Sequence, residues 1–165
     1  MKVIVNATPL IALSLINQLE LLNKLFDQVF VPLAVYQEVV IQGSGQPGSA
    51  ELASIKWIQV QAPRTSSIIE PLLLGLDKGE LQVLLLAQEI QADWVIIDER
   101  LGRRIARAMN LPVKGTVGIM LAACHAGLVS KTQALEAVQQ LRKQGIRISS
   151  QVIEWFETEL DQLQD

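Results

Sequence analysis

The sequence predicts a three-layer α/β/α fold around a central, mostly parallel sheet of about five strands. Short apolar runs recur along the chain, and segments with the apolar spacing of helices separate them. The chain has 165 residues, of which 50% are hydrophobic and 19% are charged. This composition predicts a globular protein, and the length suits one domain over residues 1–165 with a substantial core.

The short apolar runs mark the predicted strands. Each run is too short for a helix, and most are continuous rather than alternating, which is the pattern of strands covered on both faces. In chain order, the predicted strands are Val3–Val5, Val29–Val31, Trp57–Val60, Trp94–Ile97 and Leu111–Val113.

Apolar residues with helical spacing fill the stretches between these strands. Two helices are expected after each of the first three strands, and one helix after each of the other two. Pro32 is expected at the first position of its helix, and the helix after the last strand is expected to end near Gly127. The defining positions are Leu10, Leu13, Ile16; Leu21, Leu22, Leu25; Val35, Val39, Val40; Leu81, Leu84, Leu85, Ile90; Leu101, Ile105, Ala108; and Val117 to Leu128.

Two further amphipathic helices are predicted near the C-terminus, from Lys131 to Lys143 and from Ser149 to Leu163. We expect this region, about residues 131–163, to pack on the rest of the domain. Its apolar stripes can serve either the core or the surface of a partner protein. The side chains concerned are Val138, Leu141, Trp155, Phe156 and Leu160.

The segment Gly43–Gly48, GSGQPG, fits the dinucleotide-binding pattern G-x-G-x-x-G in its letters. That pattern requires a strand before it and a helix that opens within it. Here the preceding residues have a helical pattern, and Pro47 interrupts the segment. A plain loop is therefore the better interpretation, and a nucleotide-binding regulatory domain is a third hypothesis that rests on these glycines alone.

Composition excludes several classes of protein. A formal net charge of −3 gives no general attraction to nucleic acid, although a local basic patch can still provide one. A single cysteine, Cys124, excludes internal disulfides, and a single histidine, His125, excludes histidine-rich zinc sites. No apolar run approaches the roughly 18 residues of a membrane span. We therefore expect a cytoplasmic protein with no membrane partner.

Oxygen-bearing side chains recur where the predicted strands end or the next helices begin. Asn6 follows the first strand, and Asp98 closes the apolar run WVIID. Glu38 lies in the helix after the second strand, and Glu80 follows Asp77 by the three residues of a capping box. Each has a structural alternative: Asp98 as a helix N-cap, Glu38 on a solvated face and Glu80 in the capping box. Together they can converge, because ligands bind beyond the carboxyl ends of parallel strands.

Such a cluster has a chemical purpose. Carboxylates held close together repel one another and need a counter-charge. Mg²⁺ or Mn²⁺ supplies it, because hard divalent cations prefer oxygen ligands. An ion in that position can polarise a phosphodiester and deprotonate a water molecule, and a second ion can stabilise the leaving oxygen.

Four arginines follow Asp98 at spacings of three and four residues. These spacings place them along one broad face of a helix. Because arginine binds phosphate in a bidentate manner, this face can hold a nucleic-acid backbone. A solvated helix surface is the equally weighted alternative. The residues are Arg100, Arg103, Arg104 and Arg107.

At these residues the chain resembles the PIN-domain-like proteins, in particular the uncharacterised prokaryotic branch related to VapC-type toxin ribonucleases. The resemblance covers nearly the whole chain, and the order and spacing of its motifs are more specific than any one of them. The matching stretches are VIVNATPLIALSLINQLELLNKLFDQVFVPLAVYQEVV, GSGQPG, LDKGELQVLLLAQEIQADWVIIDERLGRRIARAMNLPVKGTVGIMLAACHAGLV and, more weakly, LRKQGIRIS.

The resemblance implies a PIN-like α/β/α fold and an acidic ribonuclease site that depends on Mg²⁺ or Mn²⁺. It implies that Thr8 supports the first ligand and that Glu99 is an outer carboxylate. Thr116 matches a Gly-Thr step to which we assign no catalytic role. The implied metal ligands are Asn6, Glu38, Glu80 and Asp98, of which the last three are the implied catalytic residues.

One departure from the family pattern concerns Asn6. The family reads DTSPLI or similar where this chain reads NATPLI, so a neutral amide replaces a carboxylate. Two hypotheses follow. The first is an endoribonuclease that cuts single-stranded or structured RNA, with a toxin role, an antitoxin protein as partner and a homodimeric state implied by the resemblance. The second is a catalytically weakened PIN-like module that binds RNA or protein.

Overall fold

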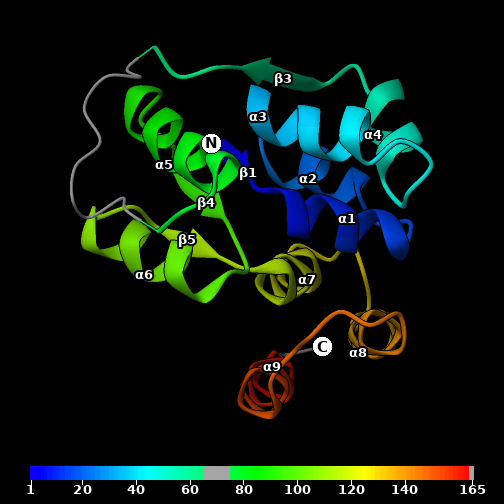
Figure 1. The fold of residues 1–165 in the computed structure, drawn as a ribbon. Coiled ribbons are helices and arrows are strands. Elements are labelled where there is room, and N and C mark those ends of the chain that lie inside the picture. Colours follow the sequence, from blue (N-terminus) through cyan, green and yellow to red (C-terminus); the bar gives the residue numbers. More distant parts are fainter. Residues whose placement is uncertain (65–74, 164–165) are drawn as a thin grey trace.

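The computed structural model describes residues 1–64 and 75–163, and their predicted α/β architecture is confirmed (Figure 1). Within these residues, five strands form one sheet in the order β3-β2-β1-β4-β5, and every neighbouring pair is parallel. The strands are β1 (Lys2–Val5), β2 (Gln28–Pro32), β3 (Ile58–Gln61), β4 (Trp94–Ile96) and β5 (Val113–Lys114).

Helices cover both faces of the sheet. Helices α3 and α5 pack together and against the strands. Helices α2 and α7 also pack together, and α2 contacts β2 whereas α7 contacts β5. Helices α8 and α9 pack on α7 and lie beyond it from the sheet (Figure 1). None of the helices in the described part of the chain has the length and hydrophobicity needed to span a lipid bilayer. The helices are α1 (Ala7–Leu15), α2 (Glu20–Leu25), α3 (Leu33–Tyr36), the π-helix η1 (Gln37–Gln42), α4 (Ser49–Ser54), α5 (Lys78–Glu89), α6 (Arg100–Ala108), α7 (Thr116–His125), α8 (Lys131–Lys143) and α9 (Ser150–Gln162).

The central strands are buried on both faces, as their continuous apolar runs predict. Val3, Ile4 and Val5 of β1 are each 0% exposed. By contrast, β3 pairs only with β2 and is partly exposed along its length. The hydrophobic effect therefore holds β1 in the middle of the molecule and fixes the position of its carboxyl end.

Some predicted boundaries are wrong by a residue or two. Pro32 was expected to open a helix, but it is the last residue of β2 and precedes α3. Proline suits this place because its fixed φ fits an extended residue next to a helix N-terminus. Between β3 and β4 the described residues contain one helix, α5, whereas two were expected; residues 65–74 lie outside the described part.

The segment Gly43–Gly48 is a loop, as predicted, and it joins η1 to α4. It follows a helix rather than a strand, and α4 begins only after the last glycine. The geometry of a dinucleotide-binding turn is therefore absent from this segment, and the third hypothesis loses its only support.

The apolar stripes of the C-terminal helices serve mainly the core. Val138 and Leu141 of α8 and Phe156 and Leu160 of α9 are all buried. Trp155 is the exception, with 45% of its surface exposed. The Ser149 hydroxyl caps α9 by accepting a hydrogen bond from the amide of Val152, so this helix starts one residue later than predicted.

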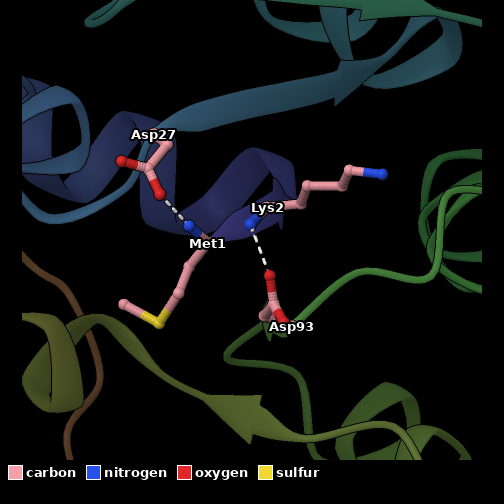
Figure 2. Close-up of polar contacts among 4 residues, drawn as sticks. All are labelled: Met1, Lys2, Asp27 and Asp93. Atoms are coloured by element: carbon pink, nitrogen blue, oxygen red, sulfur yellow. Dashed lines mark hydrogen bonds and ion pairs between the residues drawn. The ribbon is translucent and has the colours of Figure 1, made fainter.

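Polar contacts tie the amino ends of the strands together (Figure 2). The amide of Lys2 donates to Oδ2 of Asp93 at 2.6 Å. The α-ammonium of Met1 forms an ion pair with Asp27. Both aspartates precede neighbouring strands of β1, so each fixes β1 to one side of the sheet.

Candidate active site

The candidate site lies at the carboxyl ends of β1 and β4, which are neighbours in the centre of the sheet. From β1 the chain runs outward to β2 and β3 on one side, whereas β4 and β5 extend the sheet on the other. This is a switch in strand order, where parallel sheets open a crevice for ligands. The amide of Asn6 donates to the carbonyl of Ile96 at 2.9 Å, which holds the two strand ends together.

Asn6 is the residue before α1, yet its side chain does not cap that helix. Instead, Nδ2 of Asn6 donates to Oε2 of Glu99 at 3.0 Å, and the Thr8 hydroxyl donates to the other carboxylate oxygen of Glu99. Asn6 and Thr8 therefore both hold Glu99. Asn6 is 3% exposed, so its amide serves this buried contact rather than the solvent.

Glu38 lies in the first turn of the π-helix η1, where the amide of Gly43 bonds the Glu38 carbonyl at 2.9 Å. Single π-helical turns are frequent at functional sites. Although Glu38 is exposed, its Oε2 lies against α5, at 3.2 Å from where a Cβ on Gly79 would stand. Burial, and then the charges of Asp77, Glu99 and Glu80, raise the pKa of Glu38.

Glu80 forms the predicted capping box with Asp77. The amide of Glu80 donates to Oδ1 of Asp77 at 2.7 Å, and the amide of Asp77 donates to Oε2 of Glu80 at 2.9 Å. The other oxygen, Oε1, faces α6 near Gly102. Glu80 is only 8% exposed, and burial raises its pKa; the charges of Asp77 and Glu99 raise it further against the Asp77 hydrogen bond. Capping and membership of the cluster are therefore compatible.

Asp98 follows β4 as predicted, but it does not cap the next helix. Both of its carboxylate oxygens accept hydrogen bonds from Thr116, at the start of α7. Burial raises the pKa of Asp98 most; the Thr116 bonds and the charge of Arg103 oppose this, and the charge of Glu99 adds to it. Asp98 therefore faces α7 rather than Glu38 and Glu80.

Glu99 connects the cluster, although it was expected only as an outer carboxylate. It accepts from Asn6 and Thr8, and its charge raises the pKa of both Glu38 and Glu80. Glu99 precedes α6 with an extended backbone, φ −64° and ψ 131°. The charges of Glu38, Glu80 and Glu99 thus act on one another, and Glu99 also contacts Asn6. A sequence signal existed in the doublet Asp98-Glu99, but strand length alone could not decide which of the two faces β1.

The predicted arginine face is smaller than expected. Arg100, Arg104 and Arg107 are exposed on α6. Arg103 is partly buried and donates from Nη1 to the carbonyl of Ile97 at 3.0 Å. Arg103 therefore points into the molecule, and the exposed basic face comprises the other three arginines.

The donor chemistry of the cluster fits a hard divalent cation. Its groups are carboxylate and amide oxygens, and the carboxylates raise one another's pKa, so a cation among them would relieve their repulsion. Over residues 1–64 and 75–163, no three His, Cys, Asp or Glu side chains are already arranged to hold one ion. The groups that would hold a cation are the carboxylates of Glu38, Glu80 and Glu99, with Asn6 beside Glu99.

A parallel sheet between helices, with carboxylates at the switch in strand order, defines an α/β protein with a candidate ligand site at that edge. The sequence matches the family DUF3368, a PIN domain, over residues 2–162, and the chain therefore belongs to this PIN-domain family. PIN domains are generally nucleases, they typically use divalent metal ions, and the family suggests RNA binding. The predicted membership of the PIN-domain-like proteins is confirmed. A comparison with curated proteins finds no match.

Proposed function

We propose that this protein is an endoribonuclease that depends on Mg²⁺ or Mn²⁺. The observation that carries the proposal is the meeting of Glu38, Glu80 and Glu99 at the carboxyl edge of a PIN-domain sheet. They come from η1, α5 and the residue before α6, and their charges act on one another. Acidic groups whose pKa values are raised by burial and by one another support a ligand site at this edge.

Each side chain has a proposed role. Glu38, Glu80 and Glu99 bind the cation, and Asn6 adds a neutral oxygen while its NH₂ group orients Glu99. When bound, the metal supplies Lewis-acid activation of the phosphodiester and of the attacking water. Thr8 keeps Glu99 in place through its hydroxyl. Asp98 was expected as a metal ligand and catalytic residue, but its contacts with Thr116 leave it out of this proposed set.

The exposed arginines of α6 are the proposed contact for RNA. Arg100, Arg104 and Arg107 follow one another at helical spacing on a helix that begins next to Glu99. Their guanidinium groups would hold phosphates on either side of the cluster. The same helix thereby links substrate binding to the acidic edge.

Asn6 favours a second candidate function, a catalytically weakened module that binds RNA without cutting it. Its amide nitrogen is occupied by Glu99, and an amide brings no negative charge to a cation. The site therefore has one carboxylate fewer than the family pattern, and its affinity for a cation is expected to be lower.

One set of assays separates the two functions. The purified protein is incubated with single-stranded and with structured RNA and Mn²⁺, beside E38Q, E80Q and N6D. D93N is the matched control, because Asp93 lies at the opposite end of the sheet. The proposal expects the parent and D93N to cleave RNA in Mn²⁺. It expects the cleavage rate of E38Q and E80Q to fall by about 100-fold. No variant is expected to cleave RNA in EDTA.

Other results have definite meanings. A silent parent that retains RNA, together with an active N6D, supports the weakened module. Equal cleavage by the parent, E38Q and E80Q contradicts the proposed site, because the activity would then come from elsewhere.

The resemblance to VapC-type toxins extends the proposal. In that role the chain, acting as one domain, would be the cytoplasmic toxin of a toxin–antitoxin pair, a homodimer whose cleavage of RNA an antitoxin protein restrains. Co-expression with the protein encoded by a neighbouring gene tests this role: rescue of growth supports it, and harmless expression of an active nuclease contradicts it.

A further inference from the structure

Asp98 is held at both oxygens by one residue of α7. Oδ1 accepts the backbone amide of Thr116 at 2.8 Å, and Oδ2 accepts the Thr116 hydroxyl at 2.6 Å. Thr116 is 2% exposed and is the first residue of α7. A carboxylate in this position satisfies a backbone donor that the helix leaves without a partner. The geometry is that of a helix cap made by a residue 18 positions earlier in the chain.

The space around this carboxylate is filled. A Cβ on Gly115 would stand 2.7 Å from Oδ1 of Asp98 and 2.9 Å from Nη1 of Arg103. The guanidinium of Arg103 is fixed by the carbonyl of Ile97 and lies beside the carboxylate as its counter-charge. Asp98 therefore already has two hydrogen bonds and a positive charge nearby.

Glu99, the next residue, faces the other way. It meets Asn6 and Thr8 at the end of β1, and its charge acts on both Glu38 and Glu80. Successive residues after β4 thus serve two sides of the sheet end.

We propose that Asp98 is a positioning residue, which anchors the turn after β4 to α7 and so presents Glu99 to the cation. This inference rests on the proposed function. We call the two hydrogen bonds between Asp98 and Thr116, which lie beside Gly115 and Arg103, the α7 anchor. The α7 anchor fixes the backbone from which Glu99 projects, and Thr116, to which the sequence assigned no role, becomes part of the support of the site.

Four variants test the division of roles, with Mn²⁺ binding measured by calorimetry and folding by thermal unfolding in EDTA. E99Q removes the proposed ligand charge and is expected to weaken Mn²⁺ binding by about 100-fold. D98N can keep both contacts with Thr116, as acceptor from the amide and donor to the hydroxyl, and should lose less than about tenfold. T116V removes the hydroxyl and should lose about tenfold, and T116S should restore parental binding.

The outcomes separate the inference from the function on which it rests. If D98N loses as much Mn²⁺ affinity as E99Q while both remain folded, Asp98 is a ligand and the inference fails, although the nuclease proposal survives. If T116V binds Mn²⁺ like the parent, the α7 anchor does not position Glu99. If the parent neither binds Mn²⁺ nor cleaves RNA, the proposed function fails and the inference fails with it.

Discussion

The two ends of the sheet use acidic residues in opposite ways. At the amino ends, Asp27 and Asp93 each meet a donor from the first two residues, and the α-ammonium lowers the pKa of Asp27 (Figure 2). At the carboxyl ends, Glu38 and Glu80 meet other carboxylates, and their pKa is raised. In water the pKa values of Asp and Glu differ by less than one pKa unit. The opposite directions of the pKa shifts therefore come from the positions of these residues.

This difference shows which end is built for holding strands and which for binding. Paired acids at the amino ends stabilise the fold by hydrogen bonds to charged groups. Gathered acids at the carboxyl ends oppose folding at neutral pH, since the charges repel one another and are partly buried. Only the second arrangement calls for a ligand of opposite charge.

The largest expected effect comes from adding a negative charge at Asn6. N6D replaces a donor with a carboxylate at 3.0 Å from the Glu99 oxygen, and should destabilise the metal-free protein by about 2–4 kcal/mol. Mn²⁺ should restore much of this stability, which urea unfolding with EDTA or with Mn²⁺ would measure. N6A is the control, with a smaller loss of stability in EDTA and a smaller gain from Mn²⁺ than N6D. Equal stability of N6D and the parent in EDTA would contradict the electrostatic interpretation.

A smaller effect is expected at the amino end. D93N weakens the hydrogen bond from the Lys2 amide and should cost about 1 kcal/mol. Its loss should be the same in EDTA and in Mn²⁺, because the residue is remote from the acidic edge. Thermal unfolding in both conditions checks this, and a metal-dependent loss in D93N would mean that the two ends are not independent.

The smallest effect concerns pH. Because the folded chain raises the pKa of Glu80 above the 4.5 of a free glutamate, the folded state binds this proton more tightly than the unfolded state does. Its contribution to stability is therefore full below about pH 4.5 and is lost as the pH rises through the raised pKa. E80Q keeps the capping acceptor but not the charge, so its stability relative to the parent should increase with pH over this window. Urea midpoints in EDTA measure it, and a constant difference would show that Glu80 has an ordinary pKa.

Much of the fold could be predicted from the sequence because its strands are short, continuous and apolar. Val3–Val5 and Val29–Val31 lie inside β1 and β2 as predicted, since burial on both faces leaves no room for polar residues. The π-helical form of Gln37–Gln42 was not predictable, because one extra residue in a turn leaves no trace in apolar spacing.

The site was predictable by region but not by contact. Strand ends and helix starts placed Asn6, Glu38 and Glu80 at one edge, and the structure brings them there. The sequence could not show that Thr116 would take both oxygens of Asp98, because that contact depends on how α7 packs against β5. For the same reason, helical spacing alone could not predict that the Arg103 side chain points into the molecule.

Two helices begin at the acidic edge without a side-chain cap: α1 after Asn6 and α6 after Glu99. The first turn of each helix carries the partial positive charge of the helix dipole, equivalent to about half an elementary charge per helix. Backbone dipoles therefore offset part of the negative potential of Glu38, Glu80 and Glu99. The polypeptide can complete its folding before any ion arrives, so metal loading and chain folding can be separate events.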